Sequence, residues 1–381
     1  MTAKRLKWFI FWFTHSSHSS IVPLGQSRCK RYNYSCVILT VMQFLENVSL
    51  AQYSTMRLGG TASYACEITN RAELLEALQW AEARQLPWRV IGGGSNVIWH
   101  DGQFQGLVIR NSVKRFEIFE EDETNTYLTI GAGENWDSVV ERSVKLSLSG
   151  IEALSLIPGT AGATPIQNVG AYGQEIAQTL TTVEAYDTLA KDFGTLPGYD
   201  CGFGYRTSRF NTVDKGRFVI TGITLHLTKT TPLPPYYPAV EHYLTDMHVA
   251  ASPATIRDAV VSIRQAKLPD PAVVANNGSF FGNPIVSLSD YAQLGAEYNP
   301  IPHWDVEGGV KISAAWLIER AGYKDFHDPV TGMATWATQP LVLINESATS
   351  TASLLAFRDA IIKAVFLKFN ITLQQEPELL P

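Results

Sequence analysis

The stretch IPGTAGATPIQNVGAYGQEI, residues 157–176, constrains the fold more than any other part of the chain. It contains four glycines and shows neither helical nor strand periodicity. Loops of this length without secondary structure are uncommon inside compact domains unless they are functional. Its small residues and short polar side chains can wrap a diphosphate and lie flat against a heterocycle. A purely structural loop is the alternative.

A second glycine-rich segment, IGGGSNVIW (91–99), follows the predicted strand WRVI (88–91). Glycine adopts positive φ readily and lets the backbone approach a ligand, so its N–H groups can form an anion site. The segment lacks the GK[ST] of a P-loop, and it does not open a helix as the dinucleotide motif GxGxxG does. Taken alone, it fits a plain turn equally well.

Length and charge limit the class of protein. A chain of 381 residues exceeds one ordinary core, so we expect two or three domains. The net charge of -6 offers no basic surface for nucleic acid, and no stretch reaches the roughly 18–20 apolar residues that span a membrane. The cysteines form no CxxC pair, and we interpret them as free thiols in a reducing compartment. They are Cys29, Cys36, Cys66 and Cys201.

Residues 1–41 differ from the rest because they contain six basic residues and no acidic one. Three interpretations stay open: a misassigned start with Met42 as the initiator, an organellar transit peptide, or a disordered tail. The pair His15 and His18 is interpreted as solvated, so no metal site is expected. We expect a cytoplasmic protein, with an organelle as the alternative if the segment is a transit peptide.

From about residue 50 the patterns predict a mixture of helices and strands, and therefore an α+β or α/β fold. The first helix has Asn70 as its predicted cap. Helices are predicted in segments 69–85, 135–150, 252–267, 313–322 and 350–370. Strands are predicted in segments 88–91, 107–111, 126–133, 217–229 and 341–345.

The two glycine-rich segments resemble those of the UDP-N-acetylenolpyruvoylglucosamine reductase family. Further matching motifs follow in family order: GENW (133–136), CGFGYRTSRF (201–210), AKLPDP (266–271), NNGSFFGNP (276–284), KISAAWLIERAG (311–322) and EPE (376–378). The resemblance implies an α+β protein with the FAD-binding fold of the vanillyl-alcohol oxidase/PCMH type and a separate C-terminal α+β substrate domain. It also implies FAD as cofactor and NADPH as hydride donor.

The resemblance implies the following organisation. Residues 1–49 would be an N-terminal extension, disordered or preceding the true start. Residues 50–112 would form the first FAD-binding subdomain, to which residues 370–381 return. Residues 113–269 would form the second subdomain, and residues 270–369 the substrate-binding domain. We expect a monomer.

The implied reaction reduces the enolpyruvyl group of UDP-N-acetylglucosamine enolpyruvate to give UDP-N-acetylmuramate, for peptidoglycan precursor synthesis. Arg206 would hold the substrate carboxylate, since a guanidinium binds a carboxylate bidentately. Ser279 would donate a proton to the enolate-like carbon, with Gly278 allowing close approach to the flavin. Glu378 would pair with Arg206 and have a raised pKa. In the family a short strand follows this glutamate, whereas this sequence ends at Pro381, so the placement of Glu378 is left open.

The remaining site residues also come from the resemblance. The cofactor would contact Gly92, Gly93, Gly94, Ser95, Asn96, Gly159, Thr160, Gly162, Ala163, Thr164, Gln167, Asn168, Gly170, Ala171, Tyr172 and Gly173. The substrate would contact Tyr205, Tyr237, Lys267, Asn283 and Lys311, with Tyr236 as an alternative to Tyr237. Surface or core roles remain possible for the lysines and tyrosines.

Three other functions are weighed. An oxidase of the same fold often carries FAD bound covalently through histidine, and neither glycine-rich segment contains histidine. A flavin-binding homologue with impaired or different activity would follow if the shortened C-terminus removes the site. A general nucleotide-binding module lacks the expected Walker or Rossmann sequence.

Overall fold

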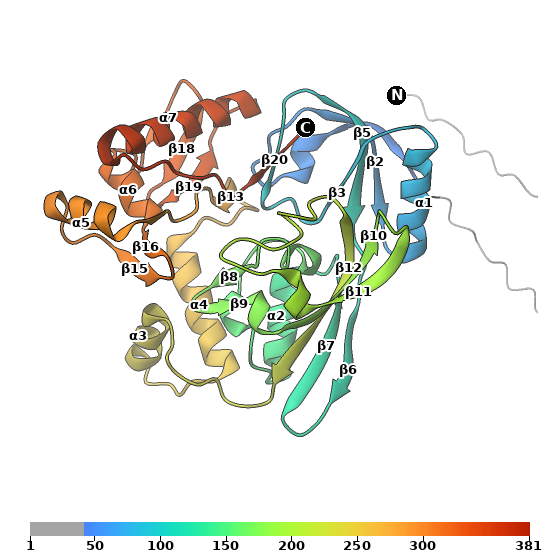
Figure 1. Cartoon of the computed structure of the whole chain (residues 1–381), viewed down its shortest axis with the longest axis horizontal. Helices are drawn as coiled ribbons and strands as arrows, with labels where there is room; N and C mark the ends of the chain where they lie inside the picture. Colours follow the sequence, from blue (N-terminus) through green and yellow to red (C-terminus); the bar gives the residue numbers. More distant parts are fainter. Residues whose placement is uncertain (1–41) are drawn as a thin grey trace, which may run out of the picture. The chain divides into compact units, whose positions relative to one another are not determined.

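In the computed structural model, which describes residues 42–381, the first sheet has the strand order β1-β2-β5-β3. β1 is antiparallel to β2, whereas β2, β5 and β3 run parallel (Figure 1). Helix α1 (Arg71–Glu82) begins as the sequence predicts, because the side chain of Asn70 accepts a hydrogen bond from the N–H of Glu73. The strands are Leu45–Ser49 (β1), Thr61–Ile68 (β2), Trp88–Ile91 (β3) and Gln103–Asn111 (β5).

The prediction that residues 1–49 form an extension is wrong at its C-terminal end. β1 pairs with β2, and Val48 on it is buried. Phe44 stacks on Trp80 of α1 with ring centroids 4.0 Å apart, so apolar packing already begins there. The rest of the extension, including the histidine pair and two of the cysteines, lies outside the described residues.

The second sheet is antiparallel, with strand order β11-β10-β12-β7-β6. Helix α2 (Trp136–Lys145) packs on it, and buried side chains of α2, β7, β10 and β12 share one core cluster. Figure 1 shows β6, β7 and β12 as long neighbouring strands. The strands are Phe116–Glu121 (β6), Asn125–Gly131 (β7), Leu180–Asp187 (β10), Asp192–Pro197 (β11) and Phe218–Thr228 (β12).

The glycine-rich segment 157–176 is held against the residues that precede α2. The N–H groups of Ala161 and Gly162 donate to the carbonyls of Glu134 and Ala132, each at 2.9 Å. A Cβ on Gly162 would lie 2.5 Å from the Cβ of Ala132, so glycine is required at this contact. The motif GENW therefore forms one wall of the segment.

Helices α3 (Pro238–Asp246) and α4 (Pro253–Lys267) follow the second sheet and pack on each other. The C-terminal part combines two small sheets with helices α5 (Leu288–Glu297), α6 (Ala314–Arg320) and α7 (Thr351–Phe369). Its first sheet has the order β13-β19-β18-β17, with strands Ala275–Ser279 (β13), His327–Asp328 (β17), Met333–Trp336 (β18) and Gln339–Asn345 (β19). The second has the order β14-β16-β15, with strands Ile285–Val286 (β14), His303–Val306 (β15) and Gly309–Ile312 (β16).

The chain end returns to the N-terminal part. β20 (Glu378–Leu380) pairs in parallel with β4 (Val97–Trp99), at the end of the glycine-rich segment 91–99. Leu380 is buried beside Val48 and Ala62. The expectation that the terminal strand is missing is therefore wrong, since the last residues form it (Figure 1).

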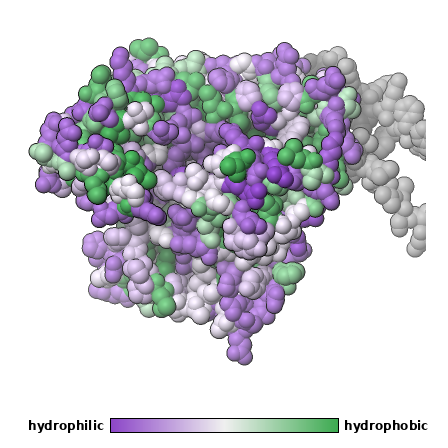
Figure 2. All heavy atoms as spheres, viewed as in Figure 1, coloured by the Kyte–Doolittle hydropathy of each residue, from purple (hydrophilic) through white to green (hydrophobic). Residues whose placement is uncertain are grey.

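On the face shown in Figure 2, hydrophobic side chains are interspersed with hydrophilic ones, as is usual for globular proteins. Within residues 42–381, no helix has the length and apolar character of a membrane span. Cys66 and Cys201 are free and buried. Burial raises the pKa of the two thiols, to about 12 and about 11, so neither is a ready nucleophile.

Candidate active site

The two glycine-rich segments meet each other. A Cβ on Gly93 would lie 3.1 Å from the Cα of Gly159, and one on Gly92 would lie 2.2 Å from Oγ1 of Thr160. The hydroxyl of Ser95 donates to the carbonyl of Pro158 at 3.0 Å. Both segments therefore belong to one site, and their close contact explains why glycines recur in them.

The first segment offers unused donors. Within the described chain, the N–H groups of Gly92, Gly93 and Gly94 donate no backbone hydrogen bond. Gly94 has φ +71°, and a Cβ there would lie 2.3 Å from the carbonyl oxygen of Tyr53. Free amides on such a tight turn are a donor set suited to phosphate oxygens. The turn thus fits the diphosphate of a dinucleotide such as FAD.

Some predicted cofactor residues instead shape the second segment. The side chain of Asn168 donates to Glu175 and to the carbonyl of Gly204, and it accepts from the N–H of Ala177. The hydroxyl of Thr164 donates to the carbonyl of Ala161 within the segment. Both side chains are buried. Their polar groups are already satisfied, so they fix the loop and do not face a free ligand.

Other predicted cofactor residues connect the glycine-rich segments to neighbouring parts of the chain or remain accessible. Asn96 donates its amide to Oε1 of Gln167 and, at 3.4 Å, to the carbonyl of Glu376. Gly170 and Ala171 form β8, which pairs with β9 (Gln174–Glu175). Gly173 has φ +85° and nothing within 4 Å of its Cβ position, while Ala163 is exposed. These residues keep backbone and small side chains at the surface of the site.

Arg206 reaches across this site to the C-terminal segment. Its Nε lies 3.4 Å from Oε1 of Glu376, and its Nη2 donates to the carbonyl of Gly170 at 3.2 Å. Arg206 has φ +56°, in the left-handed region that non-glycine residues rarely adopt. Asn211 fixes this backbone by donating to the Arg206 carbonyl at 3.1 Å. Strained backbone of this kind often orients a functional side chain.

The expected pair of Arg206 with Glu378 is not formed. Nζ of Lys215 lies 2.8 Å from Oε1 of Glu378, and both side chains are largely exposed, at 58% and 40%. The side chain of Glu376, in contrast, is 14% exposed. The position of Glu376 follows from backbone register, since its N–H donates to the carbonyl of Phe280 at 2.9 Å. The carboxylate paired with Arg206 therefore lies two residues earlier than predicted.

The raised pKa expected for the carboxyl at this site belongs to Glu376. Burial raises the pKa of this carboxyl, and the neighbouring Arg206 guanidinium opposes part of that shift. A carboxyl with a raised pKa spends more of its time protonated, so it can donate a hydrogen bond to an anion held by the same guanidinium. Of the two C-terminal glutamates, Glu376 and not Glu378 is the one buried beside Arg206.

Ser279 lies at the end of β13, exposed, beside the C-terminal segment. The next residues, Phe280 and Phe281, are 0% and 1% exposed in the core of the C-terminal part, so they hold the serine at the edge of that core. Gly278 has φ +70° and no atom within 4 Å of its Cβ position. The Ser279 hydroxyl is thus accessible, and the open space at Gly278 lets a flat ligand approach the backbone beside it.

Three predicted substrate residues lie together. Nζ of Lys311 is 4.7 Å from the ring centroid of Tyr205, and Asn283 lies close enough to the Tyr205 phenol to lower its pKa slightly. The guanidinium of Arg206 lies 5.2 Å from the same ring. Burial raises the pKa of Tyr205, which therefore stays a neutral donor. The exposed Trp304 also contacts Lys311, at 5.6 Å, and nothing in the sequence pattern had indicated it.

Tyr237 directly precedes α3 and contacts the longer glycine-rich segment. Its ring packs edge-on against Tyr172, with centroids 5.4 Å apart, and both line a cavity of about 180 Å³. The hydroxyl of Tyr236 instead donates to the carbonyl of Pro232 at 2.8 Å. Lys267 ends α4 with its side chain exposed, and no ion pair within residues 42–381 involves it. The structure therefore does not place Lys267 with the other substrate residues.

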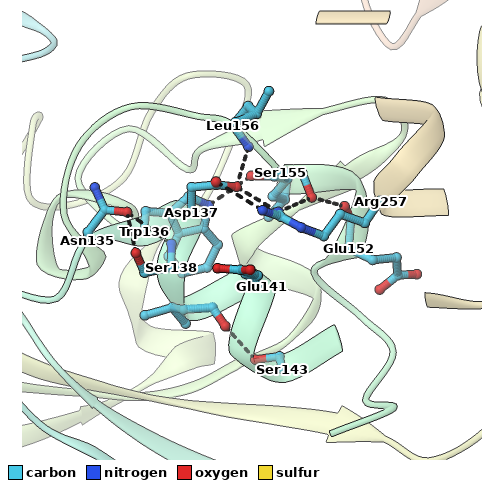
Figure 3. Close-up of polar contacts among 12 residues, drawn as sticks. Asn135, Trp136, Asp137, Ser138, Glu141, Ser143, Glu152, Ser155, Leu156 and Arg257 are labelled. Carbon is cyan, nitrogen blue, oxygen red and sulfur yellow. Dashed lines mark hydrogen bonds and ion pairs between the residues drawn. The ribbon is translucent and has the colours of Figure 1, made fainter. Parts of the chain in front are cut away.

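A polar network fixes the entry to the glycine-rich segment (Figure 3). Arg257 of α4 donates to both carboxylate oxygens of Asp137, at 2.7 and 3.0 Å, and to the hydroxyl of Ser155 at 2.8 Å. The same carboxylate accepts from the N–H of Leu156 at 2.6 Å. Burial alone would raise the pKa of Asp137, but these hydrogen bonds outweigh it and lower the pKa. Helices α2 and α4 are thereby tied to the start of the segment.

Comparison with known proteins agrees with this arrangement. A family model described as FAD binding domain matches residues 62–192, and one described as UDP-N-acetylenolpyruvoylglucosamine reductase, C-terminal domain, matches residues 270–380. The UDP-N-acetylenolpyruvoylglucosamine reductase of Thermobifida fusca is 40% identical, covering 88% of this chain and 98% of the relative. That of Cupriavidus pinatubonensis is 37% identical, covering 88% and 99%.

One solved structure extends the comparison to the fold. The crystal structure of UDP-N-acetylenolpyruvylglucosamine reductase from Thermus caldophilus matches with a TM-score of 0.62 and 22% identity, covering 90% of this chain and all of that chain. The fold and the joined glycine-rich segments define a FAD-binding flavoprotein, which confirms the expected fold class and cofactor. The chain belongs to the UDP-N-acetylenolpyruvoylglucosamine reductase family.

Proposed function

We propose that this chain catalyses the NADPH-dependent, FAD-mediated reduction of UDP-N-acetylglucosamine enolpyruvate to UDP-N-acetylmuramate. Family membership over 88% of the chain supports the reaction. The structural observation that carries the proposal is the Arg206–Glu376 pair, which lies between the glycine-rich segment and the backbone next to Ser279. Bound FAD would supply the hydride, so the protein must bind, orient and protonate the substrate.

Arg206 would bind the carboxylate of the enolpyruvyl group. A guanidinium holds a carboxylate through two parallel hydrogen bonds, and the contact strengthens as negative charge develops on the substrate. Its side chain is 30% exposed, so part of it remains open to a ligand. The contact with the Gly170 carbonyl keeps the guanidinium beside the cofactor segment.

Glu376 would act with Arg206 on the same substrate group. In its protonated form it can donate a hydrogen bond to the substrate carboxylate, and in its ionised form it holds the guanidinium before the substrate binds. We assign to Glu376 the role that the sequence analysis gave to Glu378. Glu378 would then fasten β20 through Lys215.

Ser279 would donate the proton to the substrate carbon next to the one that receives hydride. An unperturbed serine is a weak acid, so this role needs exact placement and a strongly basic intermediate. The exposed hydroxyl at the end of β13 and the open space at Gly278 support it. The backbone N–H of Glu376 is bonded to the carbonyl of Phe280, the residue after Ser279. The Glu376 carboxyl would therefore return a proton to the serine.

Substrate binding would use the cluster of Tyr205, Asn283 and Lys311, with Lys311 as a cation for the diphosphate. Tyr237 would close over the substrate from the other side, because it is 38% exposed whereas the hydroxyl of Tyr236 is already bonded. Lys267 would contribute only if the substrate reaches the end of α4. The backbone amides of Gly92–Gly94 and the surface of the 157–176 segment would hold FAD.

The expected location, oligomeric state and domain bounds also belong to this proposal. We propose a cytoplasmic monomer that needs neither nucleic acid nor membrane, with an organellar location as the alternative. We also propose three domains, at residues 50–112, 113–269 and 270–369. They correspond to the first sheet, the second sheet and the two small C-terminal sheets. The alternative of an impaired flavoprotein had rested on a missing terminal strand, and β20 removes that reason.

The test is steady-state oxidation of NADPH by the full chain loaded with FAD, followed at the nicotinamide absorbance band. We expect oxidation that depends on UDP-N-acetylglucosamine enolpyruvate, with formation of UDP-N-acetylmuramate in equal amount. Oxidation that proceeds at the same rate without the substrate, through oxygen alone, would favour an oxidase and contradict the proposal.

A further inference from the structure

The direction of the Ser279 hydroxyl depends on the backbone of β13. Within residues 42–381 this hydroxyl takes part in no hydrogen bond, so no side-chain contact holds it. The pairing of β13 with β19 is irregular between Asn276 and Ser279, where β13 carries one extra residue and forms a bulge. The side-chain oxygen of Asn276 accepts from the N–H of Gly278 at 2.8 Å and shapes this bulge. Bulges beside active sites often re-aim a side chain, and this one aims Ser279.

Asn277, inside the bulge, is bonded to the glycine-rich segment 91–99. Its amide nitrogen donates to the carbonyls of Ser95 and Val97, at 3.2 and 3.3 Å. The same nitrogen lies 3.2 Å from the hydroxyl of Thr55, in the loop between β1 and β2. The two carbonyls can only accept, so the amide must present its NH2 group to them. The bulge is therefore attached to the segment whose backbone amides would hold the diphosphate of FAD.

Thr55 joins the same two parts of the chain through its backbone. Its N–H donates to the carbonyl of Gly94 at 3.0 Å, and its carbonyl accepts from the N–H of Asn276 at 3.1 Å. The next residue, Met56, is buried in the core cluster of the C-terminal part. Thr55 is thus anchored beside β13 and bonded to the glycine-rich segment, so it bridges the two.

The side chain of Asn277 keeps an unfavourable group in this place. It is 6% exposed, and within the described chain its oxygen is buried without a hydrogen-bond partner. A buried acceptor without a donor destabilises the folded state, whereas an apolar side chain of the same size carries no such penalty. Residues that break a local rule in this way are expected at functional sites. The placement of its NH2 group is what this side chain contributes.

We propose that Thr55 and Asn277 are positioning residues for the proton transfer. Together they hold the bulge that carries Ser279 in a fixed register against the segment that would bind FAD. They act through Ser279 and transfer no proton themselves. A weak acid such as serine needs exact placement, so a small displacement of the bulge would slow the transfer. This inference rests on the proposed function, because it requires that the chain binds FAD and that Ser279 is the proton donor.

The experiment measures the two half-reactions of the FAD-loaded full chain by stopped-flow absorbance. Asn277→Leu should slow reoxidation of the reduced flavin by UDP-N-acetylglucosamine enolpyruvate about 100-fold, because the bulge loses its bonds to the glycine-rich segment. Thr55→Val should slow it about tenfold, since the amide of Asn277 keeps its two carbonyl partners. Reduction of the flavin by NADPH should be unchanged in both variants, because that step needs no proton from Ser279.

Three further variants serve as controls. Thr55→Ser keeps the hydroxyl and should restore the wild-type rate of reoxidation. The double variant of Thr55→Val and Asn277→Leu should be no slower than Asn277→Leu, because both changes remove the same contact. Thr129→Val removes a buried hydroxyl that is bonded to Thr224 at 3.2 Å in the second sheet, and it should leave both half-reactions unchanged.

A second readout is FAD binding to the apo chain, followed by flavin fluorescence. Asn277→Leu should weaken binding less than about tenfold, the effect of one or two lost hydrogen bonds. Weaker binding with a normal rate of reoxidation at saturating FAD would assign the residue to cofactor binding alone and overturn the proposal. Equal slowing of both half-reactions, or no slowing of either, would also overturn it.

Two outcomes are kept apart from these. If Asn277→Leu does not fold, as judged by circular dichroism, Asn277→Ala replaces it with the same expectation. A wild-type chain that binds no FAD, or whose reduced flavin is not reoxidised by the substrate, would refute the proposed function itself.

Discussion

The Arg206 guanidinium and the Glu376 carboxylate meet at 3.4 Å, and this contact joins the two halves of the site. Arg206 belongs to the loop that precedes β12 and donates to the Gly170 carbonyl in the cofactor segment. Glu376 belongs to the C-terminal segment that is bonded to the backbone beside Ser279. The pair therefore couples the place where FAD would bind with the place where the substrate would be protonated.

The first prediction separates the two C-terminal glutamates. Glu376→Gln should lower kcat/KM for UDP-N-acetylglucosamine enolpyruvate about 100-fold, because it removes a group aimed at developing charge. Glu378→Gln should change kcat/KM less than about threefold, since exposed ion pairs contribute little. Steady-state kinetics of the two variants checks this. A larger loss in the Glu378 variant would return the catalytic role to that residue.

The second prediction concerns Ser279. Ser279→Ala should slow reoxidation of the reduced flavin by the substrate by about 10²- to 10⁴-fold, the range of general acid catalysis. Reduction of the flavin by NADPH should be unaffected, because that step needs no proton from this serine. Stopped-flow absorbance of each half-reaction gives the result, with Ser289→Ala on the exposed face of α5 as a control. Equal slowing of both half-reactions would point to a binding role instead.

The third prediction is a pH dependence of stability. Burial raises the pKa of Glu376 above its value in the unfolded chain, so the folded state binds the proton more tightly. Its contribution to stability is complete below the unfolded value of about 4.3 and is lost as pH rises through the folded value. The free energy of unfolding of wild type relative to Glu376→Gln should therefore fall as pH increases above about 4. Urea unfolding across this range measures it, and a rising difference would contradict the assigned shift.

The fourth prediction concerns the network at the start of the glycine-rich segment. Asp137→Asn removes the charge that balances the largely buried Arg257 and should cost about 2 to 4 kcal/mol of stability. FAD affinity should fall as well, because the N–H of Leu156 loses its carboxylate partner. Glu141→Gln on the same helix breaks an exposed pair with Lys145 and should cost less than about 0.5 kcal/mol. Denaturant unfolding and FAD titration test both variants, and equal costs would show that the network is not structural.

The sequence predicted helices well where caps and apolar periodicity agree. Asn70 caps α1 through a side-chain hydrogen bond, as predicted, and the predicted segment 252–267 begins at Ser252, which caps α4 in the same way. The antiparallel pairing of β10 with β11 and β12 was not predicted, because strand partners depend on contacts between distant segments. The strand β1 was missed for the same reason, since only its pairing with β2 distinguishes it from an extension.

The site was predicted at the level of motifs, and the misplaced partner of Arg206 has a physical cause. In an extended segment, residues two apart share a face, so Glu376 and Glu378 present the same local pattern. Only the backbone register, with the N–H of Glu376 on the carbonyl of Phe280, decides which one reaches Arg206. Trp304 could not be found either, because its place beside Lys311 depends on contacts between side chains that no local pattern encodes.

The most direct measurement is an anaerobic one. The full chain, loaded with FAD and reduced by one equivalent of NADPH, is mixed with UDP-N-acetylglucosamine enolpyruvate while the flavin absorbance is followed. The account predicts rapid return of the oxidised flavin band in the wild type, about 100-fold slower return in Glu376→Gln, and near wild-type return in Glu378→Gln. Reduced flavin that stays bleached in the wild type after substrate is added would contradict the proposed reaction.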